Sequence, residues 1–433
     1  MRKYAITLGL ALVLAVSGGL GLAASDPAAP PQVAPQNLAV NPGEGQDVSV
    51  VVDALRDTVR RLPEDHRSWA LLARAYVEQA RVTGDAALYD RADQAVRRSL
   101  RIKPDQNAAA LAADASLAAA AHAFETALDK SDQALAIDPY DPTALAIRAD
   151  ALAELGRYPE QLTALRTADA RQPGVPITAR YVYAHELRGD LPAAASLLRR
   201  SASTVTGAEQ AHLLTMLADV ERRRGRLAVT ADLLDQVHVI QPDYLPAELS
   251  RARLDVAEGR LTAAVRRWER ISEQAPHSEN LVEVADLYAV LGDQQRAARE
   301  IEALRSAFLG MDRQTLSVEL DAVLFLADHG QQRVALAAAR DAWQHARGVH
   351  VADTLAWALH RNGRHREALT FARQATRLGT ADGVLWLHLG QIEAALGLTD
   401  QARRHLRYGL RLATGSSPWQ TERASRVLNR LPA

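Results

Sequence analysis

A glycine recurs at a nearly constant interval through most of this chain, and that period constrains the fold more than any other feature of the sequence. Each of these glycines ends an apolar stretch and precedes an Ala-rich one. The differences between successive positions run 33, 36, 34, 33, 38, 33 and 34, which indicates internal repeats rather than a single globular core. The glycines are Gly156, Gly189, Gly225, Gly259, Gly292, Gly330, Gly363 and Gly397.

Each repeat is predicted to be a pair of antiparallel helices. Glycine is suited to the position just after a helix, where the backbone adopts a positive φ. A proline in the second half of the repeat would end the second helix of the pair, because proline cannot continue a helix. These prolines are Pro104, Pro139, Pro173, Pro242 and Pro276. The ten predicted repeats are 66–107, 108–141, 142–174, 175–210, 211–244, 245–277, 278–315, 316–348, 349–382 and 383–416.

The repeat resembles the tetratricopeptide repeat (TPR). The signature positions of one repeat hold Trp386, Leu389, Gly390, Ala402 and Leu406, although Glu393 stands in the Tyr-like position and Thr414 in the Pro position. Trp69, Leu72, Ala73 and Tyr76 match the start of another repeat, and Tyr288 with Ala297 match a third. The resemblance implies an all-α fold, a right-handed superhelical solenoid of about ten helix-turn-helix repeats. Small residues recur where paired helices must approach closely, at Ala127, Ala194, Ala264, Ala297, Ala335, Ala368 and Ala402.

The segments outside the repeats differ in composition. Arg2 and Lys3 precede an uncharged stretch that ends at Ser25, a pattern typical of a signal peptide and also long enough for an N-terminal membrane anchor. We therefore expect a signal or anchor at 1–25, with a possible membrane tether through 4–25, and a Pro-rich linker at 26–46. The predicted N-terminal capping helix is 47–65, the TPR array 66–416 and the C-terminal capping helix 417–433.

Charge and composition exclude several classes of function. With 51 basic and 52 acidic side chains the net charge is −1, so no general positive field favours nucleic acid. The absence of cysteine excludes disulfides, thiol catalysis and thiolate metal sites. No phosphate loop, nucleophile elbow or zinc-helix motif occurs, and the array leaves no stretch for a catalytic domain. We expect no enzyme, no cofactor and no metal.

Binding is the usual role of such an array. In TPR proteins the first helix of each repeat lines a concave surface, and the resemblance implies that the residue after the Gly/Ala position faces inward. We call this series the inner ladder: Arg74, Ser116, Asp150, Tyr183, Asp219, Arg253, Asp286, Leu324, Trp357 and Gln391. The predicted binding residues are Arg74, Asp150, Tyr183, Asp219, Arg253, Asp286, Trp357 and His360. The alternative is that these polar side chains only keep the inner surface hydrated. Tyr183 would then contribute to helix packing.

The C-terminal repeats are rich in histidine. His350, Asp353, Trp357 and His360 share one helix face. They would form either a metal or anion site, or polar side chains around a tryptophan that packs between repeats. We favour the second, because His350 and His360 lie about 15 Å apart along a helix.

The sequence thus predicts a non-enzymatic scaffold or adaptor that mediates protein–protein interactions through its concave surface. The N-terminal pattern places it in the cell envelope, exported or membrane-anchored. An alternative is an accessory, chaperone-like assembly factor for an envelope enzyme or metalloprotein complex. If the N-terminal stretch is not a signal, the chain would be a cytosolic adaptor.

Overall fold

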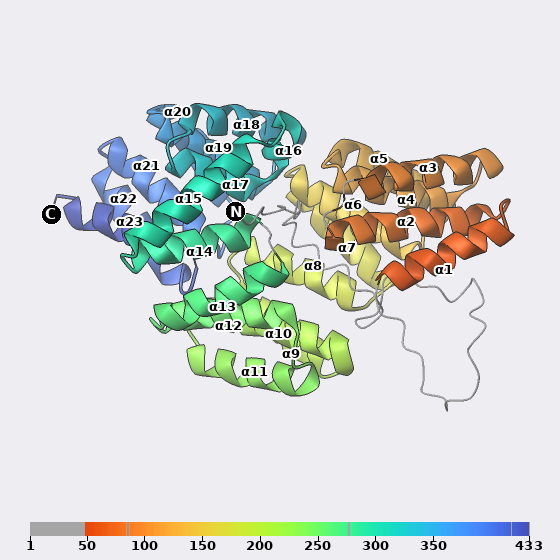
Figure 1. The fold of residues 1–433 in the computed structure, drawn as a ribbon, viewed down its shortest axis with the longest axis horizontal. Helices are drawn as coiled ribbons and strands as arrows, with labels where there is room; N and C mark the ends of the chain where they lie inside the picture. Colours follow the sequence, from red (N-terminus) through yellow and green to blue (C-terminus); the bar gives the residue numbers. More distant parts are fainter. Residues whose placement is uncertain (1–47, 84, 86, 276–277, 417, 433) are drawn as a thin grey trace. The chain divides into compact units, whose positions relative to one another are not determined.

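The computed structural model describes residues 48–432 except 84, 86, 276, 277 and 417. The predicted signal or anchor segment and the linker, at 1–25 and 26–46, lie outside the described residues. The described part contains twenty-three helices and no strand (Figure 1). None of these helices combines the length and the apolar character needed to cross a bilayer.

The described chain divides into two compact units, with the boundary between Arg180 and Tyr181. In the first unit successive helices pack as hairpins, α2 on α3, α4 on α5 and α6 on α7 (Figure 1). Its helices are α1 (Val48–Arg61), α2 (His66–Thr83), α3 (Ala87–Ile102), α4 (Ala108–Ala120), α5 (Phe124–Ile137), α6 (Pro142–Glu154), α7 (Tyr158–Arg171) and the start of α8 (Val175–Glu186).

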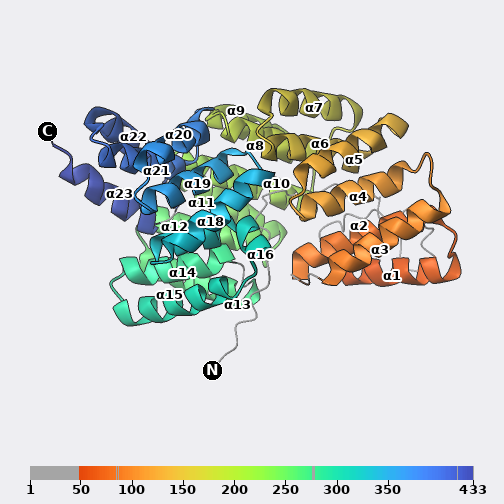
Figure 2. The same ribbon diagram turned by 90° about the horizontal axis from the view of Figure 1, so that it is seen from above.

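The second unit continues the same pattern of hairpins, seen from a second direction in Figure 2. After the end of α8 it contains α9 (Leu191–Ala202), α10 (Gly207–Arg223), α11 (Leu227–Ile240), α12 (Leu245–Ala257), α13 (Leu261–Gln274), α14 (Ser278–Val290) and α15 (Gln294–Leu309). It ends with α16 (Arg313–Val318), α17 (Leu320–Asp328), α18 (Gln332–His345), α19 (Val349–Arg361), α20 (His365–Thr376), α21 (Gly383–Ala395), α22 (Thr399–Leu412) and α23 (Pro418–Arg430).

The periodic glycines close the first helix of each hairpin, as predicted. All eight have a positive φ, between 70° and 94°. At Gly156 the N–H of Arg157 donates to the carbonyl of Leu152 at 2.8 Å, which is the closing bond of a Schellman motif. The corresponding bond forms at each of the other seven glycines.

The second repeat closes in the same way without a glycine. His122 has a φ of 55°, and the N–H of Ala123 donates to the carbonyl of Ala118 at 2.9 Å. A search for glycine passes over this position. The backbone conformation is nevertheless the same, and the His122 ring packs edge-on against Phe124 at 5.3 Å.

The packing between paired helices depends on small residues. All seven alanines predicted at close approaches are at most 3% exposed. At Gly390 a Cβ atom would lie 2.6 Å from Cγ of Leu406 and 3.0 Å from its backbone nitrogen, so α21 and α22 approach too closely for alanine. Glu393, in the Tyr-like position of the same repeat, is buried, and its carboxylate forms a hydrogen bond of 2.7 Å with Nδ1 of His405.

One repeat departs from the predicted pattern. Its first helix is divided into α16 and α17 at Glu319, whose ψ of 76° is not helical. The longest glycine spacing, from Gly292 to Gly330, spans this break and also includes the 16-residue helix α15. The fold class predicted from the sequence, an all-α solenoid of TPR-like helix-turn-helix repeats, is confirmed for the described residues.

Candidate functional site

The first helices of neighbouring repeats pack side by side. In the second unit these contacts include α10 with α12, α14 with α17, α17 with α19 and α19 with α21. We call this set of helices, α10, α12, α14, α17, α19 and α21, the first-helix wall. It carries the ladder positions from Asp219 onward, so it is where the sequence places most of the candidate binding residues.

Three ladder side chains contact the next first helix. In the first unit the guanidinium of Arg180 donates to both oxygens of Asp150, at 2.8 and 2.6 Å, and the two side chains are 4% and 7% exposed. On the wall, Ser250 donates to Asp219 at 2.9 Å. The rings of Trp357 and His388 stack with centroids 4.1 Å apart.

The three partners occupy one equivalent position, which the sequence reasoning missed. Arg180, Ser250 and His388 each lie three positions before a ladder residue, close to one helical turn earlier. Reading the sequence one turn before each ladder position would have found them. The ladder residues named here therefore cross-link adjacent repeats in addition to any role toward a partner.

Trp357 is enclosed by aromatic and charged side chains. It is fully buried, stacks on His360 at 5.0 Å as well as on His388, and donates from Nε1 to Asp328 at 3.2 Å. Burial, with smaller contributions from His365, Arg423 and Arg361, lowers the pKa of His360 to about 3, so His360 is neutral at pH 7. The predicted binding residue Trp357 is therefore covered by other side chains of the chain itself.

The histidines of these repeats pair with other side chains. Nδ1 of His388 lies 2.8 Å from Asp353, and Nδ1 of His360 lies 3.1 Å from Nδ1 of His365. His350 lies 3.9 Å from Asp382. Among the residues that the structure describes, no three His, Asp or Glu side chains converge in a way that could hold a metal ion.

The other ladder residues differ in their surroundings. Arg74 in the first unit is half-buried, and burial lowers its pKa despite the nearby Asp141. Tyr183 is half-buried on α8. Arg253 lies 3.9 Å from Asp219, with its guanidinium 6.0 Å from the Trp268 ring centre. Asp286 is 6% exposed and makes no hydrogen bond or ion pair with any described residue.

The C-terminal helix α23 lies against the first-helix wall. It packs on α14, α21 and α22. Asp328, at the end of α17, accepts a hydrogen bond from Gln420 at 2.8 Å and forms an ion pair with Arg423, both on α23. Arg361 of α19 lies 3.2 Å from the same carboxylate, and Arg423 also lies 4.6 Å above the Trp357 ring.

The loop before α23 follows the same wall. Arg222, near the end of α10, donates to the carbonyl of Thr414, and a Cβ on Gly415 would collide with the carbonyl of Arg253 on α12. Burial lowers the pKa of Arg222 to about 10. Thr414, Gly415 and α23 together therefore contact the wall from α10 to α21.

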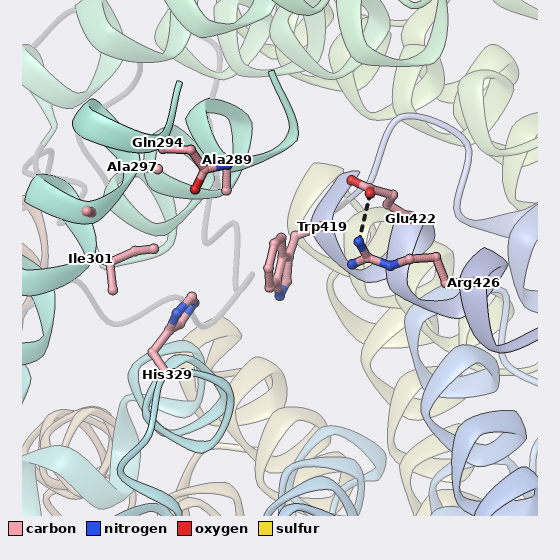
Figure 3. Close-up of a pocket in the computed structure, with 9 residues that line it drawn as sticks. Ala289, Gln294, Ala297, Ile301, His329, Trp419, Glu422 and Arg426 are labelled. Carbon is pink, nitrogen blue, oxygen red and sulfur yellow. Dashed lines mark ion pairs between the residues drawn. The ribbon is translucent and has the colours of Figure 1, made fainter. Parts of the chain in front are cut away.

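A pocket of about 440 Å³ lies between α23 and the α14–α15 hairpin (Figure 3). Small aliphatic side chains of α14 and α15 line one side. Trp419 stacks on His329 with centroids 6.0 Å apart, and the Glu422–Arg426 ion pair lies beyond Trp419, as Figure 3 shows. The pocket marks where α23 leaves space against the wall.

Four carboxylates on α14 and α17 form an acidic strip on the same wall: Glu279, Glu283, Asp286 and Asp321. Burial, strengthened by the neighbouring acids, raises the pKa of Asp321 to about 7. Burial also raises the pKa of Glu283 to about 7, although Arg253 opposes this, and holds the pKa of Asp286 well above its ordinary value. None of the four makes an ion pair with another described residue.

Comparisons with known proteins give structural similarity alone. No family model matches the sequence, and no curated protein matches it. A structure of the human IFIT1 dimer with PPP-AAAA is 15% identical and has a TM-score of 0.47, covering 86% of this chain and 88% of that chain. The APC/C hetero-tetramer Cut9–Hcn1 is 12% identical with a TM-score of 0.40, covering 89% of this chain and 82% of that chain. Such values carry no information about ligands. From its own hairpins and closures, this chain has a TPR-like fold.

Proposed function

We propose that this chain is a non-enzymatic scaffold that binds a segment of a partner protein on the first-helix wall of its second unit. The observation that carries this proposal is the docking of α23. The wall already holds one helix of the chain through a buried carboxylate, an arginine and an aromatic ring. Such contacts recognise particular side chains, and recognition of helices by helical surfaces is a recurring mode of binding.

The proposed location is extracytoplasmic, either secreted or membrane-anchored. The support is the sequence alone, namely Arg2 and Lys3 followed by an uncharged stretch to Ser25. N-terminal sequencing of the protein purified from an envelope fraction checks this. A mature chain that begins near Ser25 indicates a signal peptide, an intact chain in the membrane fraction indicates an anchor, and an intact chain in the cytosol contradicts the proposal.

Photo-crosslinking in living cells tests the binding role. A photoreactive amino acid replaces Glu283 on the wall, or Tyr183 on α8, the first helix of the repeat before the wall, in the full chain. Val239, which is 83% exposed on the outer helix α11, serves as the control position. We expect one partner protein to crosslink from Glu283 and Tyr183 and not from Val239. The same adducts from all three positions, or none from the wall, would contradict the proposal.

A further inference from the structure

The four carboxylates of the acidic strip form no ion pair with a described residue, although Arg253 acts from a distance on Glu283 and Asp321. Asp150 has Arg180, and Asp328 has Arg361 and Arg423. Asp219 lies among Arg222, Arg253 and Ser250. At Asp286, in contrast, the equivalent position of the next first helix is Asp321, three positions before the ladder residue Leu324. This position in the sequence therefore carries a carboxylate, where the partners of Asp150 and Asp219 carry the donors Arg180 and Ser250.

Asp286 gives an independent reason to expect a ligand here. Only 6% of its surface is exposed, yet it has no hydrogen-bond or ion-pair partner among the described residues. Its carboxylate oxygens are not fully enclosed, so a cationic group that reaches them would supply the partner that the fold does not. Glu283 and Asp328 are the charged groups that act on it most directly, and both are acidic.

Elsewhere on the wall, a carboxylate is paired by an arginine from a helix that is distant in the sequence. Asp328 receives Arg423 from α23, a helix that joins the wall from a distant part of the sequence. The polar contacts of α23 involve the last turns of α17 and α19, at Asp328 and Arg361. The strip lies in the first and middle turns of α14 and the first turn of α17. Helix α23 also packs on α14, so a second segment would reach the strip beside α23 at its half-buried members, Glu279, Glu283 and Asp321.

We propose that the acidic strip binds a basic peptide segment of the partner protein, whose Arg or Lys side chains pair with Asp286, Asp321 and the two glutamates beside them. This rests on the proposed function, because it names the partner's chemistry at the same wall. A divalent cation is a poorer occupant, since no three of the described carboxylates converge closely enough to hold one. A long cationic side chain needs only one or two acceptors at each position.

Fluorescence anisotropy with synthetic peptides tests the strip directly. The probe is a short fluorescein-labelled helical peptide of Ala and Arg, titrated with the full chain at low salt, and an Ala/Glu peptide of equal length is its counterpart. The Asp286→Asn/Asp321→Asn variant should bind the Arg peptide about tenfold more weakly. The matched control is Glu300→Gln/Glu302→Gln on the outer helix α15, which removes the same charge from a surface where both glutamates pair with arginines. We expect less than about a twofold change there.

A charge reversal guards against loss of folding. The charge reversal Glu283→Lys/Asp321→Lys changes two half-buried residues of the strip. This variant should no longer bind the Arg peptide and should bind the Glu peptide instead. Circular dichroism of each variant reports its helix content. Equal weakening in the strip and control variants, or no binding of the Arg peptide by the unaltered chain, overturns the inference.

The crosslinking experiment separates this inference from the proposed function. The photoreactive amino acid at Tyr183 is combined with Asp286→Asn/Asp321→Asn and compared with the chain that has the strip intact. If both capture the partner equally well, the basic-segment inference is overturned and the scaffold proposal stands. Absence of any wall-specific adduct from the unaltered chain overturns the scaffold itself. A partner whose capture is lost only in the strip variant supports both.

Discussion

Gly363 illustrates how single residues maintain the repeat. Its φ is 77° and a Cβ there would meet no atom within 4 Å, so an alanine would be unfavourable through backbone conformation alone. Gly390 has the opposite problem, because its Cβ would meet Leu406. Glycine is therefore required at the two positions for different physical reasons.

These reasons predict different losses of stability. Gly363→Ala should lower the free energy of unfolding by about 1 kcal/mol. Gly390→Ala should lower it by about 1–3 kcal/mol, because backbone and side chain of α22 must move. Urea denaturation followed by circular dichroism measures both, with the exposed Arg366→Ala as control, expected within about 0.5 kcal/mol. A smaller loss for Gly390→Ala than for Gly363→Ala would contradict the packing argument.

The buried pair Asp150–Arg180 gives a second prediction at this scale. Asp150→Ala leaves the Arg180 guanidinium buried without its carboxylate and should lower the free energy of unfolding by about 3–5 kcal/mol. Replacing both, in Asp150→Leu/Arg180→Met, should recover most of that loss because no charge then remains buried. A double-mutant cycle in urea measures the coupling. Additive single and double variants would show that the pair does not act as a unit.

Among the helices, α23 depends on a small number of side-chain contacts with the wall. Arg423→Ala removes both the ion pair to Asp328 and the cation over Trp357. We expect faster amide hydrogen exchange across Pro418–Arg430, while exchange in α19 and α21 changes little. Arg426→Ala is the control, because Arg426 is half exposed and pairs with Glu422 on the same helix. Unchanged exchange in α23 would mean that its apolar contacts suffice.

How far the sequence predicts these elements depends on the range of the interactions. Gly397 and Ala402 act within one hairpin, so their spacing is visible in the sequence and the hairpins were predictable. A helix at the C-terminus was also predictable. Its docking was not, because Arg423 meets Asp328, a residue from a hairpin much earlier in the chain. The candidate binding residues lie between these cases, since the ladder located Asp286 while its lack of a partner emerged only from the fold.

For the second unit as a whole, the acidic strip predicts a pH dependence of stability. The pKa values of Glu283 and Asp321 are raised to about 7 in the folded chain, against about 4 for unfolded carboxyl groups. The folded state therefore binds more protons between these values, and stability falls as pH rises through this range and levels off above it. Glu283→Gln/Asp321→Asn should reduce this slope, and Asp286, whose pKa is also raised, should retain part of it.

Urea midpoints at pH 5.5 and pH 8.0 measure the effect. The lowered pKa of His360 acts in the opposite direction below about pH 6.5, but equally in both proteins, so the difference between them isolates the strip. The variant should gain relative stability at pH 8.0. An identical pH slope in the two proteins would contradict the assignment.

The overall charge predicts weak interaction with nucleic acid. The net charge is −1, so no general positive field attracts a polyanion. Labelled single-stranded RNA and DNA should show no anisotropy change at physiological salt. Saturable micromolar binding of either would contradict this expectation.

The position of α23 in the sequence has a consequence for the order of biosynthesis. Helices α14, α17 and α19 emerge before residues 418–430 are made, so for a time Asp328 and Trp357 lack the Arg423 side chain above them. A chain that meets the partner while it is still being synthesised would thus present its wall before its own helix can dock. Capture of the partner during synthesis and capture by the finished protein would then differ in rate.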